Sequence, residues 1–388
     1  MPQNPTFSKP STEHHIGLMS GTSMDGIDGV LCEMDAHGKP RLIAHICHAF
    51  TAELKSDFMN LQTSGPNELH REALAGNALS VAYSKVVSEL LEQSQLEPEE
   101  VRGIGAHGQT IRHQPGLYDG LGYTIQTLNP SLLAELTHID VIAEFRERDV
   151  AALGQGAPLV PGFHAAHFND PTKNRAILNL GGIANLTLIP AHRNLLRQVS
   201  GFDCGPGNVL LDMWIKRHQD LDYDENGAWA KTGTVNSYLL GKLLDEPFLR
   251  TPAPKSTGRD LFNETWLDAI LSDCLQQTPQ NIQATLACFT AMCAINHLKE
   301  YFPECDELLV CGGGVRNQHL MDVIGETGKQ YLPNMIIAST DTVGIDPQTM
   351  EAMAFAWLSW AYFHEVPANL PAVTGALGPR ILGARYPK

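Results

Sequence analysis

The chain has 388 residues, of which 43% are hydrophobic and 18% charged, and its formal net charge is −16 at pH 7. This length suits two domains with a sizeable core, and the composition excludes a disordered chain. The acidic balance argues against a nucleic-acid partner and against a membrane surface, because both need clustered lysine and arginine.

Residues 1–15 are polar and lack the apolar core of a signal peptide, and the most apolar stretch, 353–363, is too short to cross a bilayer. The eight cysteines include no CxxC pair. We therefore expect free thiols and a cytoplasmic protein. The oligomeric state is left open, with a homodimer as one candidate.

The first third of the chain opens with apolar segments separated by small and polar turns, which predicts a three-stranded β-meander followed by helices. The expected strands are 16–20, 27–34, 41–48 and 101–106, and the expected helices are 69–93 and 130–136.

The same opening recurs in the second half. Strands are expected at 176–180, 184–189, 195–200 and 307–311, and helices at 208–217, 235–244, 263–274 and 281–300. A β-meander with helices that occurs twice predicts an α/β fold of two similar domains around a cleft.

Glycine and proline concentrate at 149–161, where we expect the linker. Domain I is then 1–149, joined by the returning residues from about 370 to 388, and domain II is 150–369. We expect each domain to carry one glycine-rich hairpin, and domain II to carry a further glycine run as well.

A run of small and hydroxyl residues, GLMSGTSMDGID at 17–28, lies between the first two expected strands. Its glycines let backbone N–H groups turn toward phosphate oxygens, with hydroxyl donors from Ser20, Thr22 and Ser23. A tight hairpin is the alternative, but it needs only two turn residues. The candidate phosphate-binding residues are Gly21, Thr22, Ser23, Met24, Asp25, Gly26, Ile27 and Asp28, of which Asp25 and Asp28 could hold Mg²⁺ through water.

Two more glycine runs follow expected strands. Gly181 and Gly182 lie in NLGGIAN, and Gly312, Gly313 and Gly314 lie in CGGGVRN. Both suit the close approach of a phosphate or a flat ring, and each taken alone is equally a turn.

Asp203, in FDCGPGN, is expected at a strand end before a glycine and proline turn. The natural N-cap of the next helix is Asn208, so the carboxylate has no capping role. We predict that Asp203 is a general base.

Polar side chains crowd 107–113 and 146–149, and both clusters suit recognition of hydroxyl and carboxylate groups or a salt-bridged surface. Gln109, Thr110 and Arg148 are the candidates within them. GIGAHG at 103–108 matches a dinucleotide pattern, but no helix is expected after it, and no GxxxxGK[ST] motif occurs.

Taken together, the motifs resemble the anhydro-N-acetylmuramic acid kinase family. They are GLMSGTSMDGID at 17–28, GAHGQTIRH at 105–113, GQGAPLVP at 154–161, NLGGIANLT at 179–187, GFDCGPGN at 201–208, KSTGRDLFN at 255–263, VCGGGVRN at 310–317 and TGALGPR at 374–380.

The resemblance implies the superfold of actin, hexokinase and Hsp70, related to ribonuclease H, with ATP and Mg²⁺ as cofactors. It implies that ATP, water and 1,6-anhydro-N-acetylmuramic acid give N-acetylmuramic acid 6-phosphate and ADP in peptidoglycan recycling. It assigns ATP phosphates to 21–28, the base to Asp203, and substrate contacts to Thr110, Arg148 and Glu351. The chain departs from the family pattern at Glu144, where aspartate is usual, and at Leu153, where glycine is usual.

Two alternatives stay open: another sugar kinase of the same superfold, and an ATP-switched binding protein like actin or Hsp70.

Overall fold

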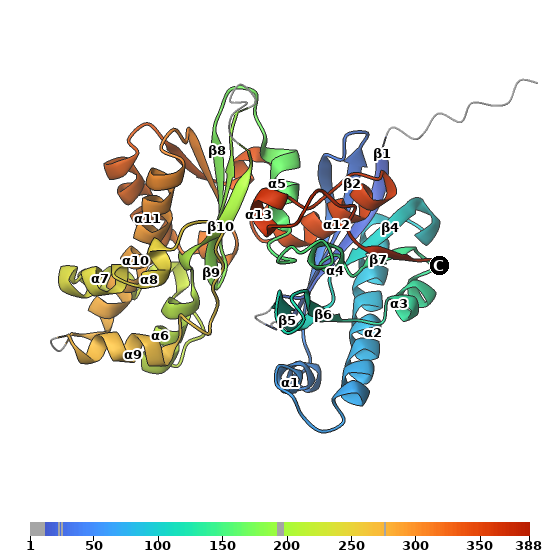
Figure 1. Cartoon of the computed structure of the whole chain (residues 1–388), viewed down its shortest axis with the longest axis horizontal. Coiled ribbons are helices and arrows are strands. Elements are labelled where there is room, and N and C mark those ends of the chain that lie inside the picture. The colour runs from blue at the N-terminus through green and yellow to red at the C-terminus, as the bar shows by residue number, and fades with distance from the viewer. Residues whose placement is uncertain (1–11, 22–23, 25, 192–197, 275–276) are drawn as a thin grey trace, which may run out of the picture. The chain divides into compact units, whose positions relative to one another are not determined.

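The computed structural model describes residues 12–21, 24, 26–191, 198–274 and 277–388. The chain forms two compact units (Figure 1). The first unit comprises Met1–Ala166 and Glu351–Lys388, and the second comprises His167–Met350.

The first unit is built on a six-stranded sheet of order β13-β7-β4-β1-β2-β3. Strands β1, β2 and β3 form an antiparallel meander, and β4 and β7 run parallel to β1. A separate hairpin pairs β5 with β6. The strands are β1 (Thr12–Met19), β2 (Gly26–Asp35), β3 (Pro40–Ala49), β4 (Val101–Ala106), β5 (Gln109–Pro115), β6 (Gly122–Thr127), β7 (Val141–Ala143) and β13 (Ala384–Tyr386).

Helices cover both faces of this sheet. Ile16 and Leu18 join a core with the long helix α2, whereas Gly17 and Gly105 face α12 so closely that a Cβ on either would meet α12 carbonyl oxygens at 1.9 and 2.0 Å. The helices are α1 (Ala52–Leu61), α2 (Glu68–Ser94), α3 (Pro130–Thr137), α4 (Glu147–Val150), α5 (Val160–Phe168), α12 (Met350–Phe363), α13 (Pro371–Thr374) and the 3₁₀ turn η1 (Pro98–Glu100).

The second unit holds a five-stranded sheet of order β10-β9-β8-β11-β12. Strands β8, β9 and β10 form an antiparallel meander, and β11 and β12 run parallel to β8. The strands are β8 (Arg175–Leu180), β9 (Ile183–Ile189), β10 (Ser200–Pro206), β11 (Glu307–Cys311) and β12 (Ile336–Ser339).

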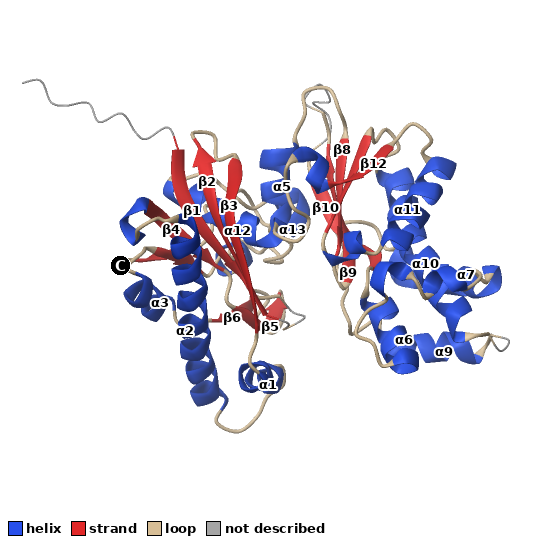
Figure 2. Ribbon diagram, turned by 180° about the vertical axis from the view of Figure 1, so that it is seen from behind, coloured by secondary structure: helices blue, strands red, loops and turns tan. Residues whose placement is uncertain are grey.

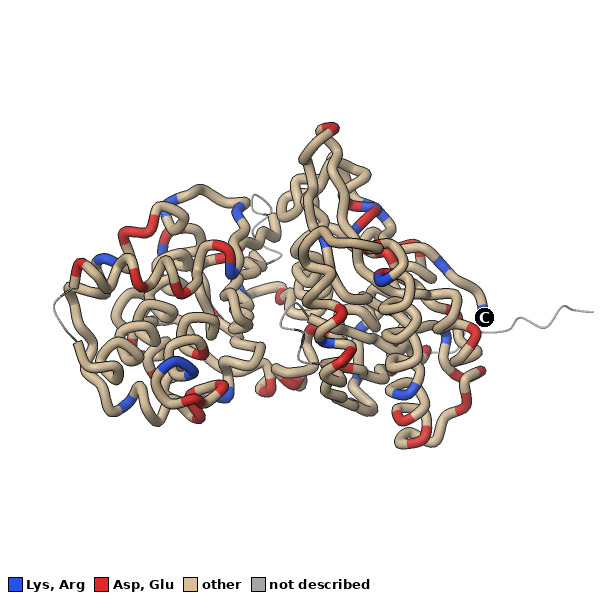
Figure 3. The backbone as a smooth tube through the Cα atoms, turned by 90° about the horizontal axis from the view of Figure 1, so that it is seen from below, with Lys and Arg blue, Asp and Glu red and all other residues tan. Residues whose placement is uncertain are grey.

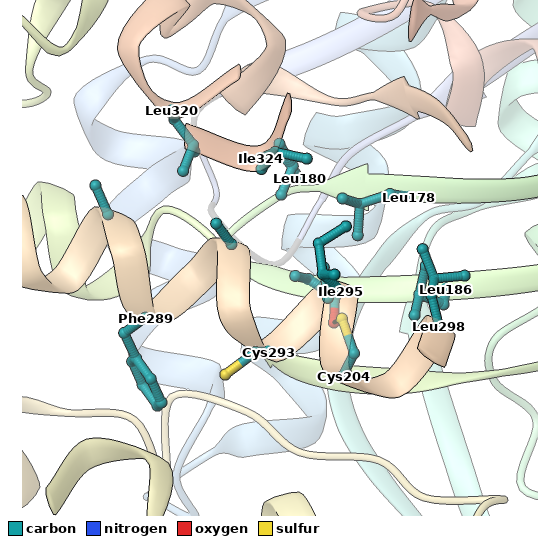
Figure 4. Packing of buried hydrophobic residues seen from close by; sticks show 14 of the residues in the cluster. Leu178, Leu180, Leu186, Cys204, Phe289, Cys293, Ile295, Leu298, Leu320 and Ile324 are labelled. Atoms are coloured by element: carbon teal, nitrogen blue, oxygen red, sulfur yellow. Dashed lines mark hydrogen bonds between the residues drawn. The ribbon is translucent and has the colours of Figure 1, made fainter. Parts of the chain in front are cut away.

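Helix α10 packs along the second sheet, and Figure 4 shows its Phe289, Ile295 and Leu298 in the core that β8, β9 and α11 complete. The helices labelled in Figure 2 are α6 (Val209–Gln219), α7 (Ser237–Leu244), α9 (Glu264–Ser272), α10 (Pro279–Tyr301) and α11 (Gln318–Tyr331), and Figure 1 also labels α8 (Pro247–Arg250). The 3₁₀ turns are η2 (Glu225–Gly227), η3 (Ala230–Thr232), η4 (Gly313–Arg316) and η5 (Thr340–Val343).

The two units share one topology. In each, the first three strands form a meander and two later strands add in parallel beside the first of them, so the order is 3-2-1-4-5. This is the ribonuclease H-like arrangement, and the expected α/β fold with a duplicated β-meander is confirmed. Acidic and basic residues are interspersed along both units (Figure 3).

The boundaries of the units differ from those expected. Residues 150–166 and 351–369 belong to the first unit, because α12 packs on its sheet and Asp149 ties the expected linker to residues near the C-terminus. The glycine and proline stretch at 149–161 is therefore part of the first unit and not the linker. The C-terminal residues do return to this unit, since β13 pairs with β7.

Candidate active site

Asp203 lies within β10 and not at a strand end. Of the expected strand 195–200, residues 195–197 lie outside the described part of the chain, and β10 begins at Ser200. Asp203 pairs with Asn185 and Gly205 pairs with Ala184, so Cys204 is the extra residue of a β-bulge. Bulges bend a strand and redirect a side chain, and they occur often beside active sites.

The carboxylate of Asp203 is held through one oxygen. Oδ2 accepts hydrogen bonds from the Ser256 hydroxyl and the Thr257 backbone N–H, both at 2.9 Å. Among the described residues, no donor reaches Oδ1. Burial raises the pKa of Asp203 above its usual value, and the hydrogen bonds from Thr257 and Ser256 oppose this shift. A carboxylate with a raised pKa and one unbound oxygen can accept a proton.

The turn Gly181–Gly182 between β8 and β9 is fixed against the start of α6. The N–H groups of Asn208 and Gly207 donate to the carbonyl oxygens of Gly181 and Gly182, respectively, both at 2.9 Å. A Cβ on Gly181 or Gly182 would meet no atom closer than 3.5 Å, so the packing of the unit does not require glycine there. These two positions thus present open backbone.

Asn208 precedes α6 as expected, but its side chain does not cap the helix. Its amide instead donates to the carbonyl oxygen of Leu180 at 2.9 Å, and so braces the same turn.

The three glycines after β11 have different roles. Gly312 has φ +84°, and a Cβ there would lie 2.4 Å from Asn179 Oδ1, while one on Gly314 would lie 2.6 Å from Leu180 Cβ. Gly313, in contrast, has nothing within 4 Å of a Cβ position. Only Gly313 of the three therefore faces free space, and the next helix, α11, begins after the 3₁₀ turn η4.

Gly313 lines a pocket of about 470 Å³ within the second unit. The pocket is walled by α6, by residues 223–226 and by the 3₁₀ turn η4, and its polar lining includes Asp212, Tyr223, Asn226 and Arg316. This volume is in the range of small-molecule sites.

In the first unit, the residues of the expected phosphate hairpin are largely engaged by the fold itself. The side chains of Met24 and Ile27 are buried in the core, so they could offer a ligand only backbone groups. Gly26 is required by strand pairing, because a Cβ there would lie 2.2 Å from the His48 carbonyl oxygen. Asp28 lies on β2, 3.3 Å from His45 Nε2, with its side chain 43% exposed. Thr22, Ser23 and Asp25 lie outside the described residues.

Ser20 does not supply the hydroxyl donor that was expected of it. The group is buried, donates to the Gly108 carbonyl oxygen at 2.9 Å and lies 3.0 Å from the Tyr83 hydroxyl. Gln109 is also buried, and its amide N–H donates to the Gly21 carbonyl oxygen at 3.2 Å. Its Oε1 has no partner among the described residues, which leaves a buried acceptor beside the hairpin.

The polar cluster at 107–113 divides between structure and surface. Arg112 pairs with Glu68 at 2.5 Å and bonds the Leu61 carbonyl oxygen, so it secures the α1–α2 connection. The Thr110 hydroxyl accepts from Gln126 at 3.2 Å and stays partly exposed.

Arg146 is the centre of the second polar cluster. Its Nε donates to His107 Nε2 at 3.0 Å, so the proton of His107 lies on Nδ1, which donates to the Ser20 carbonyl oxygen at 3.3 Å. Burial lowers the pKa of Arg146 to about 10, against the opposing effect of Glu351. Burial and Arg146 also lower the pKa of His113 to about 4, so both histidines stay neutral at pH 7.

Arg148 and Asp149, adjacent in sequence, have opposite environments. Asp149 is fully buried and accepts from Gly156 N–H, Asn369 and Thr374 at 2.7–2.8 Å, which is a structural role. Arg148 is exposed, and its guanidinium makes no hydrogen bond or ion pair within the described ranges.

The two departures from the family pattern fall at left-handed backbone positions. Glu144 has φ +60° and Leu153 has φ +64°. Aspartate and glycine, the usual family residues there, tolerate this region better than glutamate and leucine do. The departures thus lie at strained turns, and neither residue neighbours Asp203 in the chain.

Sequence reasoning missed the pocket residues Asp212, Tyr223 and Arg316, and also Arg259, whose Nη2 lies 3.9 Å from a Cβ position on Gly182. Asp212 and Tyr223 belong to no glycine motif, so no local signal marks them, whereas Arg316 was visible within VCGGGVRN at 310–317. Arg259 was visible within the KSTGRDLFN motif as a cation among small residues.

A duplicated ribonuclease H-like fold, whose second unit carries open glycine turns and a carboxylate held by two hydrogen bonds, is that of the actin-like ATPase and sugar-kinase class. The family model described as anhydro-N-acetylmuramic acid kinase matches residues 13–388. The chain belongs to that family.

Related proteins match this chain over nearly its whole length. The anhydro-N-acetylmuramic acid kinase of Ralstonia nicotianae is 48% identical over 384 residues, covering 98% of this chain and 99% of the relative. That of Cupriavidus metallidurans is 49% identical over 383 residues, with the same coverage.

Among solved structures, a dehydratase activator from Clostridium difficile has 15% identity and a TM-score of 0.46, covering 91% of this chain and 96% of that one. A hexokinase from Thermus thermophilus has 12% identity and a TM-score of 0.38, covering 91% and 99%. The fold assignment rests on strand order and family membership. No helix within the described residues is long and apolar enough to span a bilayer.

Proposed function

We propose that this protein uses ATP and water to open the 1,6-anhydro bond of 1,6-anhydro-N-acetylmuramic acid and to phosphorylate O6. The products are N-acetylmuramic acid 6-phosphate and ADP. The observation that carries this proposal is the family match over residues 13–388, because it covers every element of both units. ATP use follows from the kinase family, and ATP supply suits a reaction in the cytoplasm.

Asp203 is the proposed base. It takes a proton from water as the water oxygen bonds to C1, and the C1–O6 bond breaks. O6 then bonds to the γ-phosphorus as ADP leaves, and the proton on Asp203 passes to solvent. Support comes from the raised pKa of Asp203 and from an Oδ1 that no donor occupies within the described residues.

The pocket at Gly313 is the proposed site for the nucleoside end of ATP. Its exposed Tyr223 offers an aromatic face to the base, and the carboxylates of its lining, such as Asp212, suit ribose hydroxyls. Its volume of about 470 Å³ fits a nucleoside.

The open backbone at Gly181 and Gly182 is proposed to receive phosphate oxygens, with Arg259 as a nearby cation. The hairpin 21–28 of the first unit is proposed to do so through backbone groups. Mg²⁺ is usually held by one or two carboxylates together with phosphates, and Asp28 is the partly exposed carboxylate among the described hairpin residues. When bound, Mg²⁺ would neutralise phosphate charge.

The sugar is proposed to contact Gln109, Thr110, Arg148 and Glu351 of the first unit. Gln109 offers a buried acceptor for a hydroxyl, and the exposed Arg148 suits the carboxylate of the lactyl group.

The test is an ADP-release assay under three conditions: with the anhydro-sugar, with free N-acetylmuramic acid and without sugar. We expect turnover with the anhydro-sugar well above both other reactions, and mass spectrometry should find N-acetylmuramic acid 6-phosphate. Equal or faster turnover with the free sugar would instead identify an ordinary hexose kinase.

A further inference from the structure

The segment Lys255–Thr257 lies beside β10 and makes three hydrogen bonds with Asp203. The backbone N–H of Asp203 donates to the Lys255 carbonyl oxygen at 3.1 Å. In return, the Ser256 hydroxyl and the Thr257 N–H both donate to Oδ2 at 2.9 Å. β10 is an edge strand of its sheet and Asp203 pairs with Asn185 of β9, so this segment occupies the other, open side of the strand.

Lys255 fixes the segment to the core of the second unit. Its side chain is 9% exposed, and Nζ donates to the carbonyl oxygens of Phe248 and Leu249 at 3.1 and 2.9 Å. A third bond joins Nζ to Nε2 of His297 on α10 at 2.8 Å. An ammonium group has three donors, and the three hydrogen bonds of Lys255 use all of them. The Lys255 side chain is therefore fixed, and it holds the backbone next to Ser256 in place.

The arrangement treats the two carboxylate oxygens differently. Oδ2 receives both donors, whereas no donor among the described residues reaches Oδ1. Two bonds to one oxygen restrict rotation of the carboxylate and leave Oδ1 to accept a proton. Within the described residues the Ser256 hydroxyl makes no other hydrogen bond, so this contact is what Ser256 contributes.

We propose that Ser256 is a positioning residue for the reaction: it holds Oδ2 of Asp203 so that Oδ1 is the oxygen that takes the proton from water. This inference rests on the proposed role of Asp203 as the base. It predicts that Ser256 affects the chemical step and the protonation of Asp203 while ATP binding is unaffected.

The direction of the pH effect follows from the hydrogen bond. The Ser256 O–H stabilises the charged carboxylate, so its removal raises the pKa of Asp203 further. The other titratable groups near Asp203 are Cys204 on the same strand, Lys255 in the facing segment, and Cys293 and His297 on α10. The thiols of Cys204 and Cys293 have raised pKa values because of burial, and so stay protonated in the assay range. Burial lowers the pKa of His297. His297 is therefore the other group whose protonation would reduce activity at acidic pH, in the acid limb of the pH profile.

The experiment measures kcat/KM for the anhydro-sugar against pH in Ser256→Ala, Ser256→Thr and Ser272→Ala, together with Asp203→Asn. Ser272 is an exposed serine of the same unit whose hydroxyl bonds only a backbone carbonyl oxygen, so it is the matched control. Ser256 is exposed, so its loss should leave the fold intact.

For Ser256→Ala we expect kcat to fall about tenfold and the acid limb to move to higher pH by about half a unit, with an unchanged KM for ATP. Ser256→Thr, which keeps a hydroxyl, should restore the wild-type profile, and Ser272→Ala should match it throughout. An acid limb in Ser256→Ala that coincides with that of the wild type would overturn the proposal.

Asp203→Asn separates this inference from the proposed function. If Asp203→Asn is inactive and Ser256→Ala has the wild-type kcat and profile, the positioning role is wrong while the base stands. If Asp203→Asn keeps wild-type activity, the base assignment itself is wrong, and the positioning role is overturned with it.

Discussion

Two turns hold equivalent places in the two units: the turn between β1 and β2, and the turn between β8 and β9. Both contain small residues, but the reasons why these residues are small differ. In the first turn, Ser20 is bonded internally and Gly26 is glycine because β3 passes close to it. In the second, Gly181 and Gly182 could carry a side chain without a clash. A glycine-rich motif therefore mixes residues that the fold requires with residues that only a ligand would require.

The largest expected effect is at Asp203, next to the second turn. Asp203→Asn keeps the size of the side chain and removes the basic oxygen, so kcat should fall about 10²-fold or more. Steady-state kinetics measure this, and the melting temperature should stay near that of the wild type. Asp245→Asn, at an exposed ion pair with Arg250 in the same unit, is the control. A kcat within a few-fold of the wild type would mean that another residue activates the water.

A packing glycine of the first turn should affect stability. In Gly26→Val the new Cβ would lie 2.2 Å from the His48 carbonyl oxygen, so the strands must separate. We expect a loss of about 3 kcal/mol, or roughly 6–12 °C in Tm for a unit of this size. Thermal unfolding followed by circular dichroism checks it. An unchanged Tm would show that the hairpin tolerates a side chain there.

An open glycine of the second unit should affect ATP binding instead. Gly313→Val places a side chain in the pocket without meeting protein atoms, so we expect a KM for ATP raised about tenfold with an unchanged Tm. Gly325→Val on α11, where a Cβ also meets no atom within 4 Å, is the control. If both variants bind ATP alike, the pocket does not hold the nucleotide.

Two arginines of the first unit, Arg148 and Arg112, extend the comparison to the sugar. Arg148→Ala removes an exposed cation that the fold does not use, so the KM for the sugar should rise roughly fivefold, the value of an exposed ion pair of about 1 kcal/mol. Calorimetry should find ADP affinity unchanged. Arg112→Ala, which breaks the bond to Glu68, should lower Tm and leave the sugar KM of the folded protein unaltered. A raised sugar KM in Arg112→Ala together with a lowered Tm in Arg148→Ala would mean that Arg112 contacts the sugar and Arg148 stabilises the fold.

The smallest effect is expected at Leu153, where the chain departs from its family. Its left-handed φ of +64° disfavours leucine, and its side chain is 53% exposed, so Leu153→Gly relieves strain and loses little packing. After the entropy cost of glycine, a gain of about 0.5 kcal/mol remains. Denaturant unfolding measures it. Leu377→Gly, at an exposed leucine outside the left-handed region, should destabilise instead.

Sequence periodicity predicted most strands and helices closely, since β4 and β11 match the expected ranges and α2 differs by one residue at each end. It failed at β10, where a bulge interrupts the alternation and places Asp203 inside the strand. Of the proposed site, the motifs predicted Asp203 and the glycine turns. The residues of the pocket proposed for the nucleoside come from three separate segments, and the bond from Ser256 depends on a contact 53 residues away, which no local pattern encodes.

Asp203 is proposed to direct water to C1, so that O6 is released and then phosphorylated. Turnover in ¹⁸O-water, followed by mass spectrometry of the product, follows the water oxygen itself. We expect one label in the C1 hydroxyl of N-acetylmuramic acid 6-phosphate and none in the phosphate. Label in the phosphate, or an unlabelled C1 hydroxyl, would contradict it.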